Sequence, residues 1–430
     1  MKRASFYFIV FFTLILGCSH LDSYERKMVT KTKAIGNSTE LSAIQSVISL
    51  VQGINRSSSN IHPCGIADIE YLNRITDAQG GTVLSSSVYI INFKNNAGFA
   101  IASADINLPP VLCITDTGSF HAGDELPFGV LAMLSRLDNT TSRNANRSSG
   151  PSPWLNFPED SVNVVWSTIR VENIQGNKIR SRWAQRHRFN NLCPYVGANH
   201  APVGCVPVAV GQIMYYYGKN AVYNNFSYDW SKMRFVVDSN SCPTFLSGWS
   251  GVTHLLYALG DSTNLRAKYD STSTTAPDSL IPRTFTNFGY SNGGVRSNYR
   301  YWDQTVEIVH GHPVIVVGYR TQGYATHPDL QVDTFYRNGH AWITDQFLRV
   351  LRNVTVYDKT TGEVLYSEDL YQYYLHCNWG WGGAYNGFFL TEEFNYMDSL
   401  TMSTKSEIDT TIVEGTSYKY ILRQYTGIRP

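Results

Sequence analysis

The sequence lacks an excess of charge of either sign, a long hydrophobic run beyond its first residues, and the ligand spacing of a zinc site. Its 35 Lys and Arg residues nearly equal its 34 Asp and Glu residues, which gives a formal net charge of +1. This balance gives no reason to expect nucleic acid or an anionic surface as a partner. No later stretch reaches the roughly 18 uncharged apolar residues that a membrane helix needs. Nothing in the sequence implies a metal or an organic cofactor.

What is present is enough apolar sequence for a sizeable core. The 430 residues are 43% hydrophobic, 13% aromatic and 16% charged, a composition that is not of the disordered type. The length allows two or three domains. There are seven cysteines; setting Cys18 and Cys205 aside leaves an odd number, which we interpret mostly as buried free thiols. A disulfide between Cys193 and Cys242 remains open.

The first 18 residues have the pattern of an export signal. Basic residues at 2 and 3 precede an apolar stretch at 6–16 that is too short to span a membrane. Cys18 follows Gly17, which resembles a bacterial lipobox with Cys18 as the lipidated first residue of the mature chain. An ordinary export signal with an incidental cysteine is the alternative. We expect an exported lipoprotein, held at the outer membrane or cell surface or released from it.

The rest of the chain divides into two units joined by a linker. Residues 19–40 form a polar tether, and residues 41–138 an α+β unit with helices over 41–51 and 126–137 and strands over 83–93, 98–103 and 111–115. Residues 139–165 form a linker whose first part is rich in Asn, Ser, Arg and Pro, which makes it a site for proteolytic cleavage. Residues 166–430 form the larger unit. This layout suggests a propeptide; a spacer or substrate-binding domain is the alternative.

Cys205 occupies the first residue of a predicted buried helix. Apolar residues after it recur at helical spacing through Tyr217, and Pro207 falls in the first turn, where its missing N–H does no harm. Gly204 lets the chain turn tightly into the helix. A thiol at a helix N-terminus faces unpaired N–H groups and the positive end of the dipole, so we expect a thiolate here.

A histidine and an asparagine follow in the order needed for a cysteine hydrolase. His340 lies between glycine and a strand-like run, 135 residues after Cys205, and Asn378 follows Cys205 by 173 residues. In papain-like enzymes the His and Asn follow the Cys by roughly 130–150 residues. The longer distance to Asn378 suggests an insertion. The papain signature around the cysteine is absent.

These motifs together resemble the streptopain family of secreted cysteine proteases. The resemblance rests on Gly-Cys-Val at 204–206, Gly-His-Ala at 339–341 and Asn-Trp-Gly-Trp-Gly-Gly at 378–383, and it extends into the N-terminal unit at 88–92, 98–105 and 116–120. It implies a papain-like α+β fold, a zymogen whose inhibitory prodomain is residues 41–138, and endopeptidase activity on proteins or peptides.

The resemblance also implies roles for five residues. Cys205 matches the nucleophile, His340 the general base and Asn378 the amide that orients the imidazole. Gln185 falls where the family carries its oxyanion-hole glutamine, and Trp379 resembles the ring that shields the His–Asn contact from water.

Two departures from the family pattern concern substrate access. Residues 345–375 carry extra sequence with a turn at 359–362, which we interpret as an inserted hairpin near enough to the site to change access. Residues 392–411 contain no glycine where the family's type member has a glycine-rich loop. Two rival functions stay open: a Cys-His amidase or acyltransferase, and a catalytically silent surface-binding protein on the same fold.

Overall fold

The structure is a computed structural model, and only part of the chain is described below. The described residues are 38–57, 65–76, 82–104, 109–124, 126–127, 129–135, 137, 161–219, 222–233, 235–237, 243–245, 249–322, 335–391 and 419–430. The export signal, the tether as far as residue 37, residues 139–160 of the linker, Cys242 and the segment 392–411 lie outside them.

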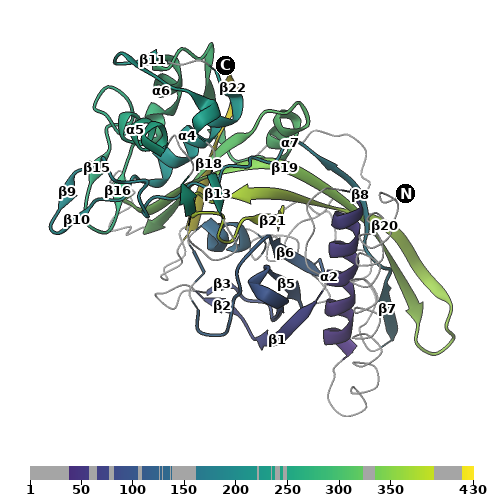
Figure 1. The fold of residues 1–430 in the computed structure, drawn as a ribbon. Coiled ribbons are helices and arrows are strands. Elements are labelled where there is room, and N and C mark those ends of the chain that lie inside the picture. The colour runs from purple at the N-terminus through teal and green to yellow at the C-terminus, as the bar shows by residue number, and fades with distance from the viewer. Residues whose placement is uncertain are drawn as a thin grey trace, which may run out of the picture.

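The N-terminal unit begins with helix α2 (Ser38–Ser57), as the apolar period predicts. Its inner face buries Ala43, Ile44, Val47, Leu50, Val51 and Ile54. This face packs against strands of the same unit and against β8 (Arg170–Gln175). At Gly53 the helix approaches β8 so closely that an added Cβ would lie 2.4 Å from Cγ2 of Val171. Figure 1 shows α2 standing beside β8 and β7 (Val162–Trp166).

Four antiparallel strands complete the N-terminal unit, in the order β1 (Ile66–Leu72), β4 (Val88–Phe93), β5 (Phe99–Ser103) and β6 (Val111–Thr115). The strand expected over 83–93 is interrupted, because a separate β3 (Thr82–Leu84) pairs with β2 (Ile75–Thr76). Within the helix expected over 126–137, residues 129–135 are helical and residues 126 and 127 are not.

The larger unit contributes the other half of the same sheet. Its strands follow the order β21 (Gly387–Leu390), β20 (Val364–Asn378), β19 (Phe335–Asp358), β18 (Val314–Gln322), β22 (Lys419–Arg429) and β17 (Asn292–Asn298). Helices α4 (Cys205–Tyr217), α5 (Trp249–Leu259) and α6 (Ile281–Asn287) gather at one end of it, and α7 (Tyr301–Val309) packs on β19 and β18 (Figure 1). This unit also contains short two-stranded antiparallel sheets. They pair β9 (Tyr195–Val196) with β10 (Asn199–His200), β11 (Val222–Tyr223) with β12 (Phe226–Ser227), β13 (Phe235–Val237) with β14 (Pro243–Phe245), and β15 (Lys268–Tyr269) with β16 (Thr274–Thr275).

The two units are joined edge to edge. Strand β6 pairs antiparallel with β21, with Thr115, Ile114 and Cys113 opposite Gly387, Phe388 and Phe389. The result is one 12-stranded sheet. One apolar core runs along it and includes Val47 of α2, Ile114 of β6 and Trp379 of the larger unit. A second core surrounds α4.

The structure contains the predicted inserted hairpin, but its tip points away from the candidate site, near which we expected it. Strands β19 and β20 form it, and β7 and β8 pair with β19 on its other side. Strand β20 has 15 residues, or ~50 Å of extended chain, so the turn at 359–362 lies far from Asn378. Figure 1 shows the tip beside β7, beyond α2 and away from α4. The inserted tip of the hairpin therefore lies beside β7 and does not border the site, although the other ends of β19 and β20 carry His340 and Asn378. Residues 162–165, which we assigned to the linker, belong to β7.

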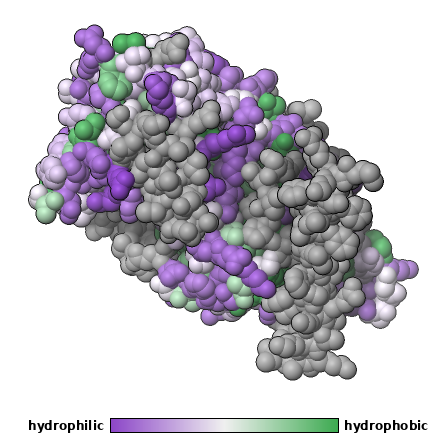
Figure 2. Space-filling view, viewed as in Figure 1, coloured by the Kyte–Doolittle hydropathy of each residue, from purple (hydrophilic) through white to green (hydrophobic). Residues whose placement is uncertain are grey.

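Three cysteines are buried, and the visible surface is mostly polar, as in a folded globular protein. Cys113, Cys193 and Cys377 are buried free thiols in the described residues, and the disulfide considered between Cys193 and Cys242 involves a residue outside them. In Figure 2 the described residues on the visible face are mostly hydrophilic, with hydrophobic ones scattered among them. No helix in the described ranges combines the length and apolarity needed to cross a membrane.

The hairpin's small apolar cluster gives a test of its packing. Val354 is fully buried with Val162, Val356 and Leu370, whereas Val165 on β7 is 43% exposed. We expect Val354→Ala to lower the free energy of unfolding by about 1–3 kcal/mol through the cavity it leaves. Val165→Ala is the control and should change it by less than about 0.5 kcal/mol. Chemical denaturation measures both; equal effects would contradict the described packing.

Candidate active site

Cys205 opens helix α4 as the sequence predicts. Gly204 precedes it with φ of +96°, a left-handed conformation that side chains rarely adopt. An added Cβ there would also lie 3.2 Å from Thr274. This turn places the Cys205 sulfur where the backbone N–H groups of Cys205, Val206 and Ala341 can donate to it. Because Ala341 follows His340, the contact brings the nucleophile and the histidine strand together.

The thiolate expected at this helix start is not favoured in this form of the chain. Burial raises the pKa of Cys205, and the three backbone N–H groups only partly oppose it. The residue itself is partly exposed, so the packing close to the sulfur is what disfavours the charge. The sequence revealed the helix dipole but not this packing.

His340 lies on β19 and is buried, with 5% of its surface exposed. Its Nε2 is 2.8 Å from the carbonyl oxygen of Trp379, and its ring stacks on Trp381 at 4.4 Å between centroids. A carbonyl can only accept, so Nε2 carries the proton and Nδ1 keeps its lone pair. Burial lowers the pKa of His340 to about 4, although the Trp379 carbonyl opposes this. The imidazole is therefore neutral at pH 7.

Asn378 ends β20 beside this pair, but its side chain does not hold the imidazole here. The Nδ2 group donates to the carbonyl of Ser181 at 3.0 Å. The Oδ1 atom accepts from Gln212 at 3.4 Å and from the Gly380 N–H at 3.3 Å. The orienting contact that the family resemblance implied for Asn378 is instead made by the backbone carbonyl of the next residue, Trp379.

Gln185 and Trp379 complete the predicted set. Gln185 is partly exposed in the loop before α4, and its carbonyl accepts from the N–H of Val203 at 2.9 Å, two residues before Cys205. Trp379 is fully buried, with Nε1 donating to the carbonyl of Tyr385 at 2.7 Å. Its ring packs against Trp342 and Trp381 beside His340, where a water-excluding ring is expected.

Sequence reasoning missed the polar groups that hold this set. Gln212 is fully buried on α4 and contacts Ser181, Trp183 and Asn378. Asn386 accepts from the Trp379 N–H at 3.0 Å. The one available signal was that Gln212 is a polar residue within an apolar helix, two turns after Cys205.

The N-terminal unit lies directly on the histidine. A Cβ added to Gly129, at the start of the helix over 129–135, would lie 2.4 Å from Cζ3 of Trp379 and 3.3 Å from Cδ2 of His340. Only a residue without a side chain allows this approach. His340 is thus covered by a segment of the other unit.

A charged cluster also crosses between the units. Asp116 accepts from Lys178 at 2.6 Å and lies 3.2 Å from Nε2 of His376. The other nitrogen of His376 is 2.6 Å from Asp345, and both of these side chains are fully buried. Burial opposes protonation of His376, but the carboxylates of Asp345 and Asp116 outweigh it and raise its pKa. The raised pKa favours the protonated form of His376, which can donate to Asp345 in its own unit and to Asp116 in the other.

Two other features lie apart from this constellation. Asp68, Glu70 and His121 bring possible metal-ligand atoms within 4.8 Å of one another in the N-terminal unit, but His121 already contacts Glu70 at 2.5 Å.

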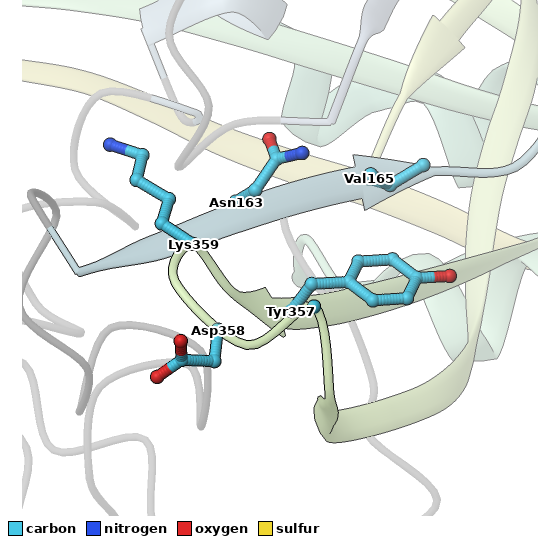
Figure 3. Close-up of a pocket in the computed structure, with 6 residues that line it drawn as sticks. Asn163, Val165, Tyr357, Asp358 and Lys359 are labelled. Carbon is cyan, nitrogen blue, oxygen red and sulfur yellow. The ribbon is translucent and has the colours of Figure 1, made fainter.

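A pocket of about 600 Å³ opens at the hairpin tip between β7 and the turn. Figure 3 shows its lining, which includes Lys359 and Tyr357 but none of the predicted catalytic residues.

Comparison with protein families separates the chain into the same two parts. Residues 183–389 match the Peptidase C10 family, and this stretch contains Gln185, Cys205, His340, Asn378 and Trp379. Residues 56–141 match the family described as Spi protease inhibitor. The exact boundaries of the domains given above remain a prediction.

Individual proteins are also similar to this chain. Streptopain of Streptococcus pyogenes serotype M28 (strain MGAS6180) and streptopain of serotype M1 are each 25% identical over 357 residues, covering 74% of this chain and 76% of the relative. Among solved structures, a fragment of prointerpain A from Prevotella intermedia matches with a TM-score of 0.45 and 17% identity, covering 76% of this chain and 92% of the fragment. The predicted site residues lie inside the matched region, and the chain is a cysteine endopeptidase related to the streptopain family, with an α+β peptidase unit behind an α+β prodomain.

Proposed function

We propose that this peptidase is made as a latent zymogen, exported and anchored by lipid on Cys18, and activated when cleavage within the linker separates the peptidase unit from residues 41–138. Its substrates are proteins or peptides, and its own prodomain is its first inhibitor. The observation that carries the catalytic part of the proposal is the hydrogen bond from His340 Nε2–H to the Trp379 carbonyl, which leaves Nδ1 as the unprotonated nitrogen. We assign the Cys205 thiol to this nitrogen.

The mechanism is acyl transfer through the thiolate. His340 Nδ1 takes the proton of Cys205, and the sulfur attacks the peptide carbonyl. The Trp379 carbonyl stabilises the resulting imidazolium by accepting from Nε2–H. Gln185 and the Cys205 N–H are assigned to the developing oxyanion. The imidazolium then protonates the leaving amine, and His340 assists water in releasing the acyl-enzyme.

Latency follows from the cover over His340 and the low polarity around it. The helix that begins at Gly129 fills the space beside Trp379 and His340. Burial there favours the neutral thiol and the neutral imidazole over the reactive ion pair. The match of residues 56–141 to an inhibitor family supports the same assignment.

The Cys205 nucleophile is tested by substitution. We expect Cys205→Ala to abolish cleavage of casein by the activated chain, a loss on the order of 10⁶-fold if the thiol supplies the reaction. Cys193→Ala is the matched control, because Cys193 is another free thiol outside the site. Equal casein cleavage by Cys205→Ala and the parent would overturn the peptidase assignment. Turnover confined to small amides or to amine transfer would favour the amidase or acyltransferase.

Latency predicts a difference in thiol reactivity. Because burial raises the pKa of Cys205, its alkylation by iodoacetamide in the full chain should be slow at pH 7 and rise as the pH increases. After cleavage within the linker and loss of the prodomain, alkylation should become fast at lower pH. Mass spectrometry of the Cys205 peptide measures both rates. The same pH profile in the two forms would show that the prodomain does not control the thiol.

The Asp116 cluster predicts how strongly the prodomain is held. We expect Asp116→Asn to weaken its association about ten- to one-hundred-fold, since a charge-assisted hydrogen bond contributes about 1.5–3 kcal/mol. In the parent, His376 is charged below its raised pKa, so association should weaken as the pH rises through that pKa. The variant should show a flatter dependence. The rate of prodomain loss from the nicked chain, followed at several pH values, checks this; Asp68→Asn on the far strand β1 is the control.

A further inference from the structure

Gln212 occupies a position where an unpaired polar group would be strongly unfavourable. It lies on α4 seven residues after Cys205, which is two helical turns and ~10 Å along the axis. Its side chain is fully buried within the apolar core that includes Trp183 and Val208. A buried amide costs about 1–3 kcal/mol when its hydrogen bonds are missing. Its partners therefore determine why it can be accommodated here.

The partners of Gln212 fix the direction of its amide. Its Oε1 accepts from the backbone N–H of Trp183 at 3.2 Å and from the Ser181 hydroxyl at 3.1 Å. A backbone N–H can only donate, so the oxygen of Gln212 must face Trp183. The Nε2 group then faces Oδ1 of Asn378.

The same logic fixes Asn378. The carbonyl of Ser181 can only accept, so Nδ2 of Asn378 must face it. Oδ1 is left to accept from Gln212 and from the N–H of Gly380, two residues ahead. A side-chain oxygen that accepts from the N–H two residues on closes an Asx-turn.

This turn contains the peptide that contacts the histidine. Trp379 is the residue between Asn378 and Gly380, and its carbonyl accepts from His340 at 2.8 Å. Rotation of the Asn378 side chain would break the Asx-turn and leave the direction of that carbonyl unfixed. The chain of contacts therefore runs from Trp183 through Gln212, Asn378 and the Trp379 carbonyl to the imidazole.

We propose that Gln212 is a positioning residue for the peptidase reaction, which aims the Trp379 carbonyl at His340 by locking the Asn378 turn. The inference rests on the proposed function of the site, since it concerns the same histidine. It assigns Asn378 an indirect role, through the backbone that it shapes.

The test is Gln212→Met, which keeps the volume and removes all three hydrogen bonds. In the full chain activated under reducing conditions, we expect kcat to fall about ten- to one-hundred-fold with little change in KM. The alkaline limb of kcat/KM should also move to lower pH, because a loosened Trp379 carbonyl stabilises the imidazolium less. An unchanged kcat and pH profile would overturn the proposal.

Gln304→Met is the matched control. Gln304 is also a fully buried glutamine, but it bonds Thr344 and Gln424. It should lose comparable stability, measured by thermal unfolding, while keeping kcat and the pH profile. If Gln304→Met lowers kcat and shifts the pH profile as much as Gln212→Met, the effect is general destabilisation and the proposal fails.

Two further measurements keep the test decisive. If Gln212→Met does not fold, Gln212→Leu replaces it, since leucine is also apolar and of similar size and makes none of the three hydrogen bonds. The pH dependence of Cys205 alkylation is compared in parent and variant without any peptide. If the parent cleaves no peptide, the proposed function fails, while a shifted alkylation profile in the variant would still support the positioning role and an unshifted one would refute it.

Discussion

The hydrogen bond from His340 to the Trp379 carbonyl is the contact on which the site depends. It places the proton on Nε2 and leaves Nδ1 unprotonated, as the proposed base. Because the donor and acceptor lie in an aromatic, water-excluding setting, the bond is stronger than it would be in water. A backbone carbonyl cannot rotate independently as a side chain can. Its direction is therefore set by the turn at 378–380 and by β20, which leads into that turn.

That turn ties catalysis to the architecture of the whole sheet. Asn378 is the last residue of β20, and Asn386, just before β21, accepts from the Trp379 N–H. The loop that carries the Trp379 carbonyl is thus held at its start by α4 and at its end by the strand next to the prodomain. The N-terminal unit contacts this loop and the strand that follows it. Gly129 packs on Trp379 and so covers His340, and β6 pairs with β21 and so continues the sheet.

Sequence reasoning could nominate the candidate catalytic residues because their signals are local. A glycine before Cys205, an apolar helical period after it, and a glycine-broken aromatic run after Asn378 are each visible within a dozen residues. It could not find the Trp379 carbonyl, since every residue has one. The thiolate expectation failed because burial comes from packing between segments far apart in the chain. The direction of the hairpin could not be predicted for a related reason. It is set by the pairing of β19 with β7 and β8, and strand pairing across long sequence separations leaves no local pattern.

Because the two units share one sheet, removing the N-terminal unit would change the position of β21 in that sheet. In the latent chain β21 is an interior strand, with β20 on one side and β6 on the other. Departure of the N-terminal unit turns Gly387–Leu390 into an edge, with backbone donors and acceptors that must find water or another strand. The apolar residues Phe388, Phe389 and Leu390, buried in the latent chain, lie on that new border. If the prodomain is released as proposed, β21 becomes an open edge strand whose unpaired backbone groups could form hydrogen bonds with an extended polypeptide.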